Sequence, residues 1–242
     1  CLSLSGCGFF LFFERVVYFD LETTGLDVTT ANVVEIAAID ANTGSVFAST
    51  VTPTTQSNVQ AQGVNGIQPD ELAASPHFPT AFQRLRRFID RLCITLHATL
   101  AQDIERTDSG RFLQAARPVT PPLVVLVAHN ARRYDAVILA CECWRHGISL
   151  KYLESWCFVD TLDLTALFRN IAGQSPRIGP NHCECAKLQC LGAHYDGASG
   201  ILNGAGSVVA HHRQALPPHR ALADAVTLFD VVVGLSGRLG IS

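Results

Sequence analysis

Two carboxylates stand one residue apart at the end of an apolar run. The segment VVYFDLETTGLD (16–27) passes from hydrophobic residues to Asp20 and Glu22 and then breaks at a Thr-Thr-Gly turn. Side chains of a strand alternate between its faces, so Asp20 and Glu22 share one face and Leu21 lies on the other. Two carboxylates on one face repel each other unless a cation lies between them. The pair is typical of a strand end that reaches solvent or of a metal site, and alone it does not separate the two.

Two more aspartates favour the metal site. Asp135 follows the apolar segment LVVLVAHN (123–130), and Asp224 interrupts the apolar helical segment PHRALADAVTLFDVV (218–232). An aspartate on a buried helix face costs several kcal/mol unless it is paired or bound to a cation. Together with Asp20 and Glu22 they would form an all-oxygen site, which suits Mg²⁺ or Mn²⁺ rather than Zn²⁺.

His219 is a candidate general base. It precedes Asp224 by five residues, which on a regular helix is about 140° around the axis. We therefore expect His219 at or just before the first turn, on the loop side. A histidine there titrates near neutral pH and can take a proton from water. The alternative interpretation is a surface histidine beside His211 and His212.

The elements that would position these residues form an α/β pattern. Three apolar strands come first, of which the second and third form a hairpin; two further strands alternate with helices, as in a parallel sheet. We expect one mixed sheet covered by helices, with its site at the carboxyl ends of the strands. The predicted strands are 16–21, 33–40, 45–53, 123–128 and 157–159, and the predicted helices are 78–96, 132–146, a stretch around 185–195, and 220–235. We expect a loop with one short helix over 54–77, a loop over 97–122, and Asp160 as the N-cap of a helix.

Composition limits the class of protein. The chain has 242 residues, of which 48% are hydrophobic and 16% charged, which predicts one globular domain over 16–237. Residues 1–15 begin apolar but have neither the basic n-region of a signal peptide nor enough length to cross a bilayer. We expect them to be the poorly ordered remnant of a longer N-terminal segment. The net charge of −3 gives no global positive field. The nine cysteines lack a framework spacing, which predicts reduced thiols and an intracellular location. The sequence shows no convincing transmembrane segment, so we expect no membrane partner.

Three segments resemble the motifs of a known family. FDLETTGL (19–26), HNARRYD (129–135) and HRALAD (219–224) occur in the order of the three motifs of the DEDDh 3′→5′ exonucleases. The spacing within HNARRYD looks most like the three-prime repair exonuclease branch. The resemblance implies a ribonuclease H-like fold with a mixed five-stranded sheet, in which the first three strands are antiparallel and the rest parallel.

The resemblance also implies roles for individual residues. Asp20, Glu22, Asp135 and Asp224 would bind two Mg²⁺ ions, for which Mn²⁺ can substitute, with Asp20 bridging them and His219 deprotonating the attacking water. Thr23 and Leu26 would meet the terminal nucleotide. The residues implied near the substrate in the second motif are His129, Asn130, Arg133 and Tyr134. For Arg133 and Tyr134, a surface arginine and a packing tyrosine are the alternatives.

The function predicted from these residues is removal of nucleotides from the 3′ end of single-stranded DNA, with release of nucleoside 5′-monophosphates. The nearest alternative is a 3′→5′ exoribonuclease of the ribonuclease T or oligoribonuclease kind, which would share the metal chemistry. A catalytically inactive nucleic-acid-binding domain is a third hypothesis, although all five expected residues are present. A homodimer is also a hypothesis.

Overall fold

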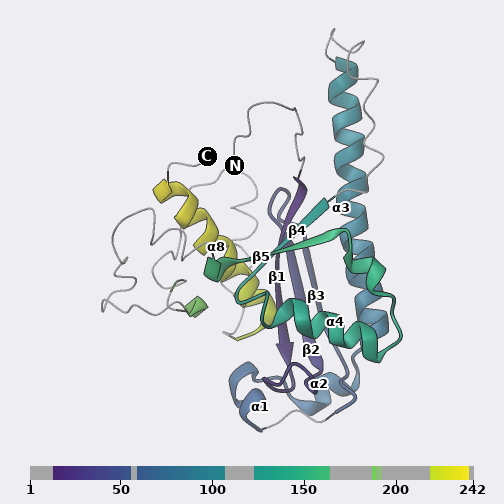
Figure 1. Cartoon of the computed structure of the whole chain (residues 1–242), viewed down its shortest axis with the longest axis vertical. Coiled ribbons are helices and arrows are strands. Elements are labelled where there is room, and N and C mark those ends of the chain that lie inside the picture. Colours follow the sequence, from purple (N-terminus) through teal and green to yellow (C-terminus); the bar gives the residue numbers. More distant parts are fainter. Residues whose placement is uncertain are drawn as a thin grey trace.

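The computed structural model describes residues 13–55, 59–106, 123–163, 187–189, 191 and 219–239. Its elements are β1 (Phe13–Thr23), β2 (Val33–Asp40), β3 (Val46–Thr50), α1 (Val59–Asn65), α2 (Pro69–Ala73), α3 (Phe78–Arg106), β4 (Leu123–Ala128), α4 (Asp135–Arg145), η1 (Leu150–Leu153), β5 (Trp156–Asp160) and α8 (Ala221–Leu239). Figure 1 shows the sheet at the centre, with α3 and α4 on one side and α8 on the other.

The five strands form one sheet in the order β3-β2-β1-β4-β5. The pairs β1–β2 and β2–β3 are antiparallel, and the pairs β1–β4 and β4–β5 are parallel. The predicted fold class is therefore confirmed. The central strand β1 is the one that carries Asp20 and Glu22.

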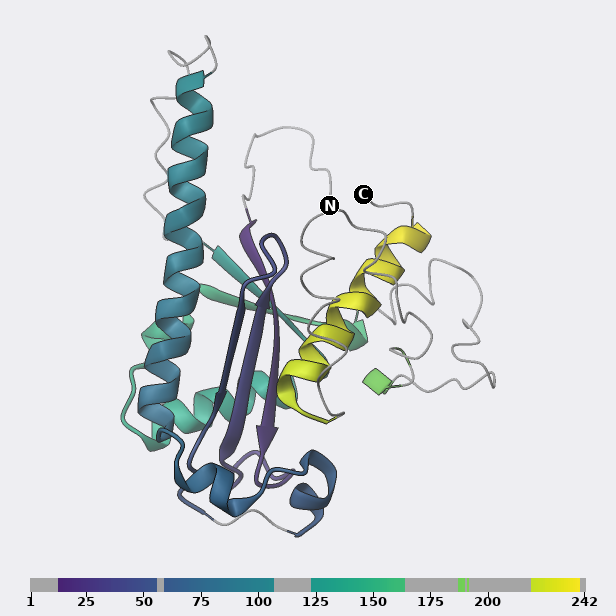
Figure 2. The same cartoon turned by 180° about the vertical axis from the view of Figure 1, so that it is seen from behind.

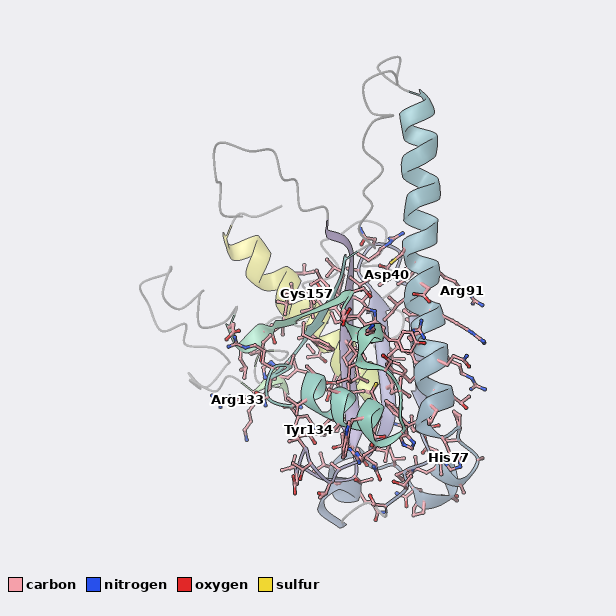
Figure 3. The ribbon with its side chains drawn as sticks, turned by 45° about the vertical axis from the view of Figure 1, so that its right-hand side comes forward. Asp40, His77, Arg91, Arg133, Tyr134 and Cys157 are labelled. Atoms are coloured by element: carbon pink, nitrogen blue, oxygen red, sulfur yellow. The ribbon has the colours of Figure 1, made fainter. Side chains whose placement is uncertain are left out.

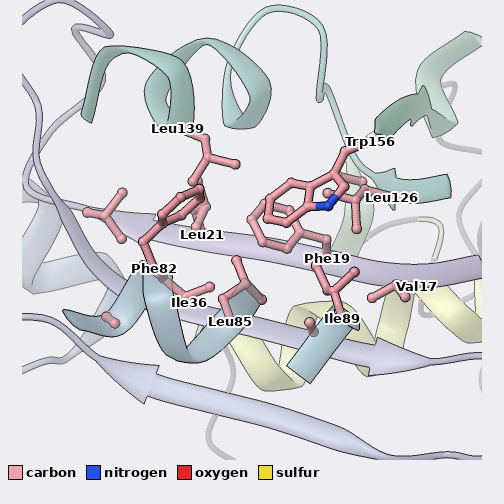
Figure 4. Packing of buried hydrophobic residues seen from close by; sticks show 14 of the residues in the cluster. Val17, Phe19, Leu21, Ile36, Phe82, Leu85, Ile89, Leu126, Leu139 and Trp156 are labelled. Atoms are coloured by element: carbon pink, nitrogen blue, oxygen red, sulfur yellow. The ribbon is translucent and has the colours of Figure 1, made fainter. Parts of the chain in front are cut away.

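Alternate residues of β1 face two separate cores. Val17, Phe19 and Leu21 are buried in the larger core, against side chains of α3 such as Leu85 and Ile89. Figure 4 shows these side chains packed between the sheet and α3, with Leu139 of α4 closing the same core. Burial of large apolar side chains on this face holds β1 in its register, because a shift by one residue would exchange its two faces.

The opposite face of the sheet is covered by α8, as Figure 2 shows from behind. Tyr18 packs its ring edge-on against Phe229 of α8, with ring centroids 5.0 Å apart. Ala37 and Ile39 of β2 belong to the same buried cluster. This cluster fixes α8 against β1 and β2 from Ala221, the first residue of the helix, to Val231.

Several predicted boundaries were wrong. α3 continues to Arg106, ten residues beyond the predicted end at 96, because HATLAQDIER (97–106) contains helix-forming residues and no glycine or proline. The polar character of this stretch is compatible with an exposed helix as well as with a loop. The segment 54–77 holds two short helices rather than one, β1 begins at Phe13 rather than at 16, and α4 begins at Asp135 rather than at 132.

Other predictions fall outside the described residues. They concern 1–12, most of the expected loop at 107–122, and most of the expected helix around 185–195, of which residues 188, 189 and 191 are helical. Within the described part of the chain, none of the helices combines the length and the apolar character that crossing a lipid bilayer requires.

Candidate active site

Asp20 and Glu22 lie on the face of β1 that α8 covers. They continue the alternation that places Tyr18 against α8, so both carboxylates point toward that helix and Leu21 points into the opposite core. In the register with β2, Asp20 lies opposite Ala37, a small residue, and Glu22 lies opposite Glu35. The pattern of the sequence thus predicted the shared face correctly.

Asp224 completes a cluster of three carboxylates. It lies in the first turn of α8. One carboxylate oxygen each from Asp20, Glu22 and Asp224 lies within 4.8 Å of the other two. All three side chains are partly exposed, so the cluster is open to ions and to a substrate.

Asp135 reaches the cluster from the N-terminus of α4. It is buried, and the backbone N–H of Leu21 is a hydrogen-bond donor that lowers the pKa of its carboxyl. This contact is possible because β1 continues past Tyr18, its last residue paired with β4. The negative charge of Asp135 in turn raises the pKa of Asp20. The structure therefore brings all four predicted carboxylates together from β1, α4 and α8.

The cluster binds protons more tightly than isolated carboxyls do. Burial is the largest cause at each group, and mutual repulsion adds to it. The pKa of Glu22 rises to about 8, that of Asp135 to about 7 and that of Asp224 to about 6, and the pKa of Asp20 lies well above its usual range. A bound cation stabilises the ionised form of carboxyls whose pKa is raised in this way, because it offsets their mutual repulsion.

His219 lies immediately before α8, on the loop side where the sequence placed it. Its backbone has φ 57°, in the left-handed region. The Nδ1 atom of its ring lies 3.4 Å from Nε2 of Gln189. Its charge lowers the pKa of Asp224, so the ring lies near the carboxylate cluster.

The start of α8 is held by ion pairs of Arg220 that the sequence did not predict. Arg220 donates from Nε and Nη2 to both oxygens of Glu35, at 2.7 to 3.1 Å, and from Nη2 to Glu71 at 2.7 Å. Glu35 interrupts the apolar strand VVEIAAID (33–40), as Asp20 and Glu22 interrupt the apolar run of β1. A charged residue inside a buried strand is the sequence feature that could have indicated an ion pair here.

The turn after Glu22 is tied to the second motif. The hydroxyl of Tyr134 lies 2.6 Å from Oγ1 of Thr23 and donates to the carbonyl of Gly25 at 2.7 Å. Tyr134 also packs against the larger core, so it joins packing with a specific polar contact. Leu26 lies at the tip of this turn and is 85% exposed. Arg133 is exposed, and Figure 3 shows it at the margin of the protein, with Tyr134 against its body.

The turn before Asp135 is held by Asp160 at the end of β5. The two oxygens of Asp160 accept the backbone N–H groups of Asn130 and Arg132, at 2.9 and 3.2 Å. One of them also accepts the N–H of Leu162 at 3.0 Å, which is the N-cap contact predicted from the sequence. Asn130 has φ 61°, a conformation that asparagine tolerates. The Nδ1 atom of His129 lies 2.9 Å from Oγ1 of Thr161.

Comparison with known families agrees with this geometry. Residues 17–124 match the RNase T family model, which is described as Exonuclease. The matched segment contains Asp20 and Glu22 on β1, whereas Asp135, His219 and Asp224 lie beyond its end. Less than half of the 242 residues therefore resemble this exonuclease family at the level of sequence. No curated protein sequence matches the chain.

Solved structures of exonucleases share the fold of this chain. The zinc-bound complex of Escherichia coli exonuclease I with single-stranded DNA superimposes with a TM-score of 0.58 at 16% identity, covering 93% of this chain and 41% of that one. Exonuclease I from Methylocaldum szegediense gives 0.59 at 16% identity, with the same two coverages of 93% and 41%. A 3′-exonuclease that recognises a histone mRNA stem-loop gives 0.55 at 14% identity, covering 92% of this chain and 63% of that one. The chain thus spans less than half of exonuclease I.

Proposed function

We infer that the protein is a metal-dependent 3′→5′ exonuclease that acts on single-stranded DNA and releases nucleoside 5′-monophosphates. The observation that carries this proposal is the cluster of Asp20, Glu22 and Asp224, whose oxygens converge from β1 and α8 within 4.8 Å. The match of residues 17–124 to the exonuclease family model supports the same reaction, and we propose that the chain belongs to that family.

The carboxylates fit divalent cations with a preference for oxygen ligands. Asp20, Glu22, Asp135 and Asp224 would hold two Mg²⁺ or Mn²⁺ ions, because the donor set contains only carboxylates. Burial, with repulsion from neighbouring carboxylates, raises their pKa values, and a bound cation would favour their ionised forms. When bound, the ions would offset the charge that develops on the attacking and leaving oxygens of the phosphodiester.

His219 would act as the general base. Its imidazole would take one proton from the attacking water, while the bond between phosphorus and the 3′ oxygen of the shortened strand breaks. The products are then a nucleoside 5′-monophosphate and a strand with a new 3′ hydroxyl. The position of His219 outside the helix, beside Asp224, leaves its ring free of helical packing constraints.

The turn after Glu22 would receive the terminal nucleotide. Leu26 presents an exposed apolar side chain on which a base can pack, and Thr23 is held in place by Tyr134. Arg133 would bind backbone phosphate through its exposed guanidinium. His129 and Asn130 would act by shaping the turn before Asp135 as much as by touching the substrate, because both are bound to the end of β5 or the turn after it.

DNA is proposed because HNARRYD resembles the three-prime repair exonucleases, and structural neighbours include exonuclease I bound to single-stranded DNA. An exoribonuclease is the second candidate, since another neighbour is a 3′-exonuclease that recognises an mRNA stem-loop. The homodimer and the intracellular location stay predictions from the sequence.

The test uses two single-stranded oligonucleotides of one sequence, one DNA and one RNA, each labelled at the 5′ end. With Mg²⁺ we expect a ladder shortened from the 3′ end and release of nucleoside 5′-monophosphates, faster for DNA, and no cleavage in EDTA. Asp20→Asn should abolish cleavage, and Asp70→Asn, at an exposed position on α2, should leave it unchanged. Cleavage in EDTA, or products shortened from the 5′ end, would refute the proposal, and faster cleavage of RNA would establish the second candidate.

A further inference from the structure

A charged cluster of three side chains, Glu35, Arg220 and Glu71, joins three elements beside the proposed metal site. Arg220 binds Glu35 of β2 through two nitrogens, which is the planar arrangement in which guanidinium and carboxylate interact most strongly. Its Nη2 also binds Glu71 of α2 at 2.7 Å. The Glu35 side chain is 8% exposed and the Arg220 side chain 21%, so solvent screens this pairing only in part.

Glu35 also holds the backbone of α8. Its Oε2 atom accepts the N–H of Ala221, the first residue of the helix, at 2.8 Å. The first N–H groups of a helix have no partner within the helix, so a carboxylate there satisfies one of them and favours the positive end of the helix dipole. The carbonyl of Arg220 in turn accepts the N–H of Asp224 at 3.0 Å. Side chain and backbone of Arg220 thus both fix the turn that carries Asp224.

The position of Glu35 makes its neutralisation important. Glu35 lies opposite Glu22 across β1 and β2, and its charge raises the pKa of Glu22, Asp20 and Asp224. Arg220 acts in the opposite direction on the pKa of Glu22. Without Arg220, the Glu35 carboxylate would keep the backbone N–H of Ala221 but lose its guanidinium partner, which leaves its negative charge uncompensated beside Glu22.

We propose that Arg220 is a positioning residue, which clamps the first turn of α8 to Glu35 and Glu71 and so sets Asp224 and His219 against Asp20 and Glu22. Figure 2 shows this first turn next to the ends of β1 and β2, where the clamp acts. The left-handed backbone of His219, directly before Arg220, lies at the same junction. This role rests on the proposed function, because it concerns the metal ligands and the base of that reaction.

Three measurements on the full chain test the clamp in Arg220→Gln, with Arg84→Gln on the exposed face of α3 as the matched control. Mutation of a residue that holds metal ligands in place typically lowers metal affinity or activity by about 10- to 100-fold. We expect kcat to fall by about that factor with KM for the oligonucleotide little changed, and the affinity for Mn²⁺, followed by electron paramagnetic resonance, to weaken by about 10-fold. In the metal-free protein, amide hydrogen exchange of Ala221 and Asp224 should accelerate. Arg84→Gln should change none of these.

Further variants keep the test decisive. Arg220→Lys keeps the charge but not the two-nitrogen geometry, so its changes in kcat, Mn²⁺ affinity and amide exchange should be smaller than those of Arg220→Gln. If Arg220→Gln does not fold, Arg220→Lys takes its place in the test. Unchanged kcat, Mn²⁺ affinity and exchange in an Arg220 variant would overturn the clamp and leave the proposed function intact. If wild type shows no Mg²⁺-dependent cleavage while Arg220→Gln still weakens Mn²⁺ binding and accelerates exchange, the proposed function fails and the clamp holds for the metal site alone.

Discussion

Replacing Asp224 by asparagine should abolish exonuclease activity and, without metal, stabilise the fold. Burial raises the pKa of Asp224 from 3.8 to about 6; the charge of His219 opposes this rise and that of Glu35 adds to it. The fold therefore favours the protonated form, and ionisation costs stability as pH rises through about 6. The difference between a pKa of 3.8 and one of about 6 lowers the free energy of unfolding by about 3 kcal/mol at pH 8, when the group is fully ionised. Part of this cost persists in the variant, because the amide of asparagine is also polar and half-buried.

We expect a gain of about 1–2 kcal/mol at pH 8 in EDTA, or a rise of about 2–8 °C in melting temperature for a domain of this size. At pH 4 the aspartate is protonated in the fold, so the two proteins should melt together. Differential scanning calorimetry at the two pH values measures this, with Asp70→Asn as a control that should not differ from wild type at either.

With saturating Mg²⁺ the order should reverse at pH 8, because wild type gains binding energy that the variant has lost. A variant that is less stable than wild type at pH 8 in EDTA, or a difference that is the same at pH 4 and pH 8, would contradict the electrostatic reasoning. Near-normal turnover by Asp224→Asn would remove this residue from the metal site.

Three other predictions concern the surrounding groups. In EDTA the melting temperature of wild type should fall from pH 5 to pH 8, because Asp135 and Glu22 ionise with pKa values of about 7 and 8. Mg²⁺ should make the melting temperature depend less on pH. A melting temperature in EDTA that does not change over this range would contradict the prediction. Tyr134→Phe should lower the free energy of unfolding by about 1–2 kcal/mol and raise KM, because the turn at Thr23 loses its contact with the tyrosine hydroxyl. The control Tyr152→Phe, at a ring that lies under Arg86, should change neither quantity. An unchanged KM in Tyr134→Phe would exclude this role for the hydroxyl. Asp160→Asn should lower the free energy of unfolding by roughly 2–3 kcal/mol in urea titrations, because the N–H groups before Asp135 lose a charged acceptor. The exposed Asp163→Asn is the control for that variant, and an equal effect of the two would refute the assignment.

The sequence was sufficient to predict the sheet and the four carboxylates, because both depend on local patterns. Alternation along β1 places Asp20 and Glu22 on one face, and an aspartate inside an apolar helix marks Asp224. The clamp formed by Glu35 and Arg220 depends on the register between β1 and β2 and on the docking of α8, which a single sequence does not contain.

The end of α3 was misjudged for a different reason. The polar residues of 97–106 predict a loop, but these residue types also favour helix, and no glycine or proline interrupts them. The turn at 129–134 illustrates the same limit at smaller scale. A helix was expected from 132, but Asn130 adopts a left-handed conformation held by Asp160 from another strand, which delays the helix to Asp135.

The alternation of β1 also bears on how the chain finds its native pairing. A slip of β1 by one residue would place Asp20 and Glu22 among Phe82, Leu85 and the other apolar side chains of the larger core, and would place Leu21 beside Asp224. Both outcomes are costly, since buried unpaired charge and exposed leucine are each unfavourable. The residues proposed for catalysis therefore also act against misfolding, and variants that neutralise both carboxylates should populate misregistered, aggregation-prone states more often than wild type.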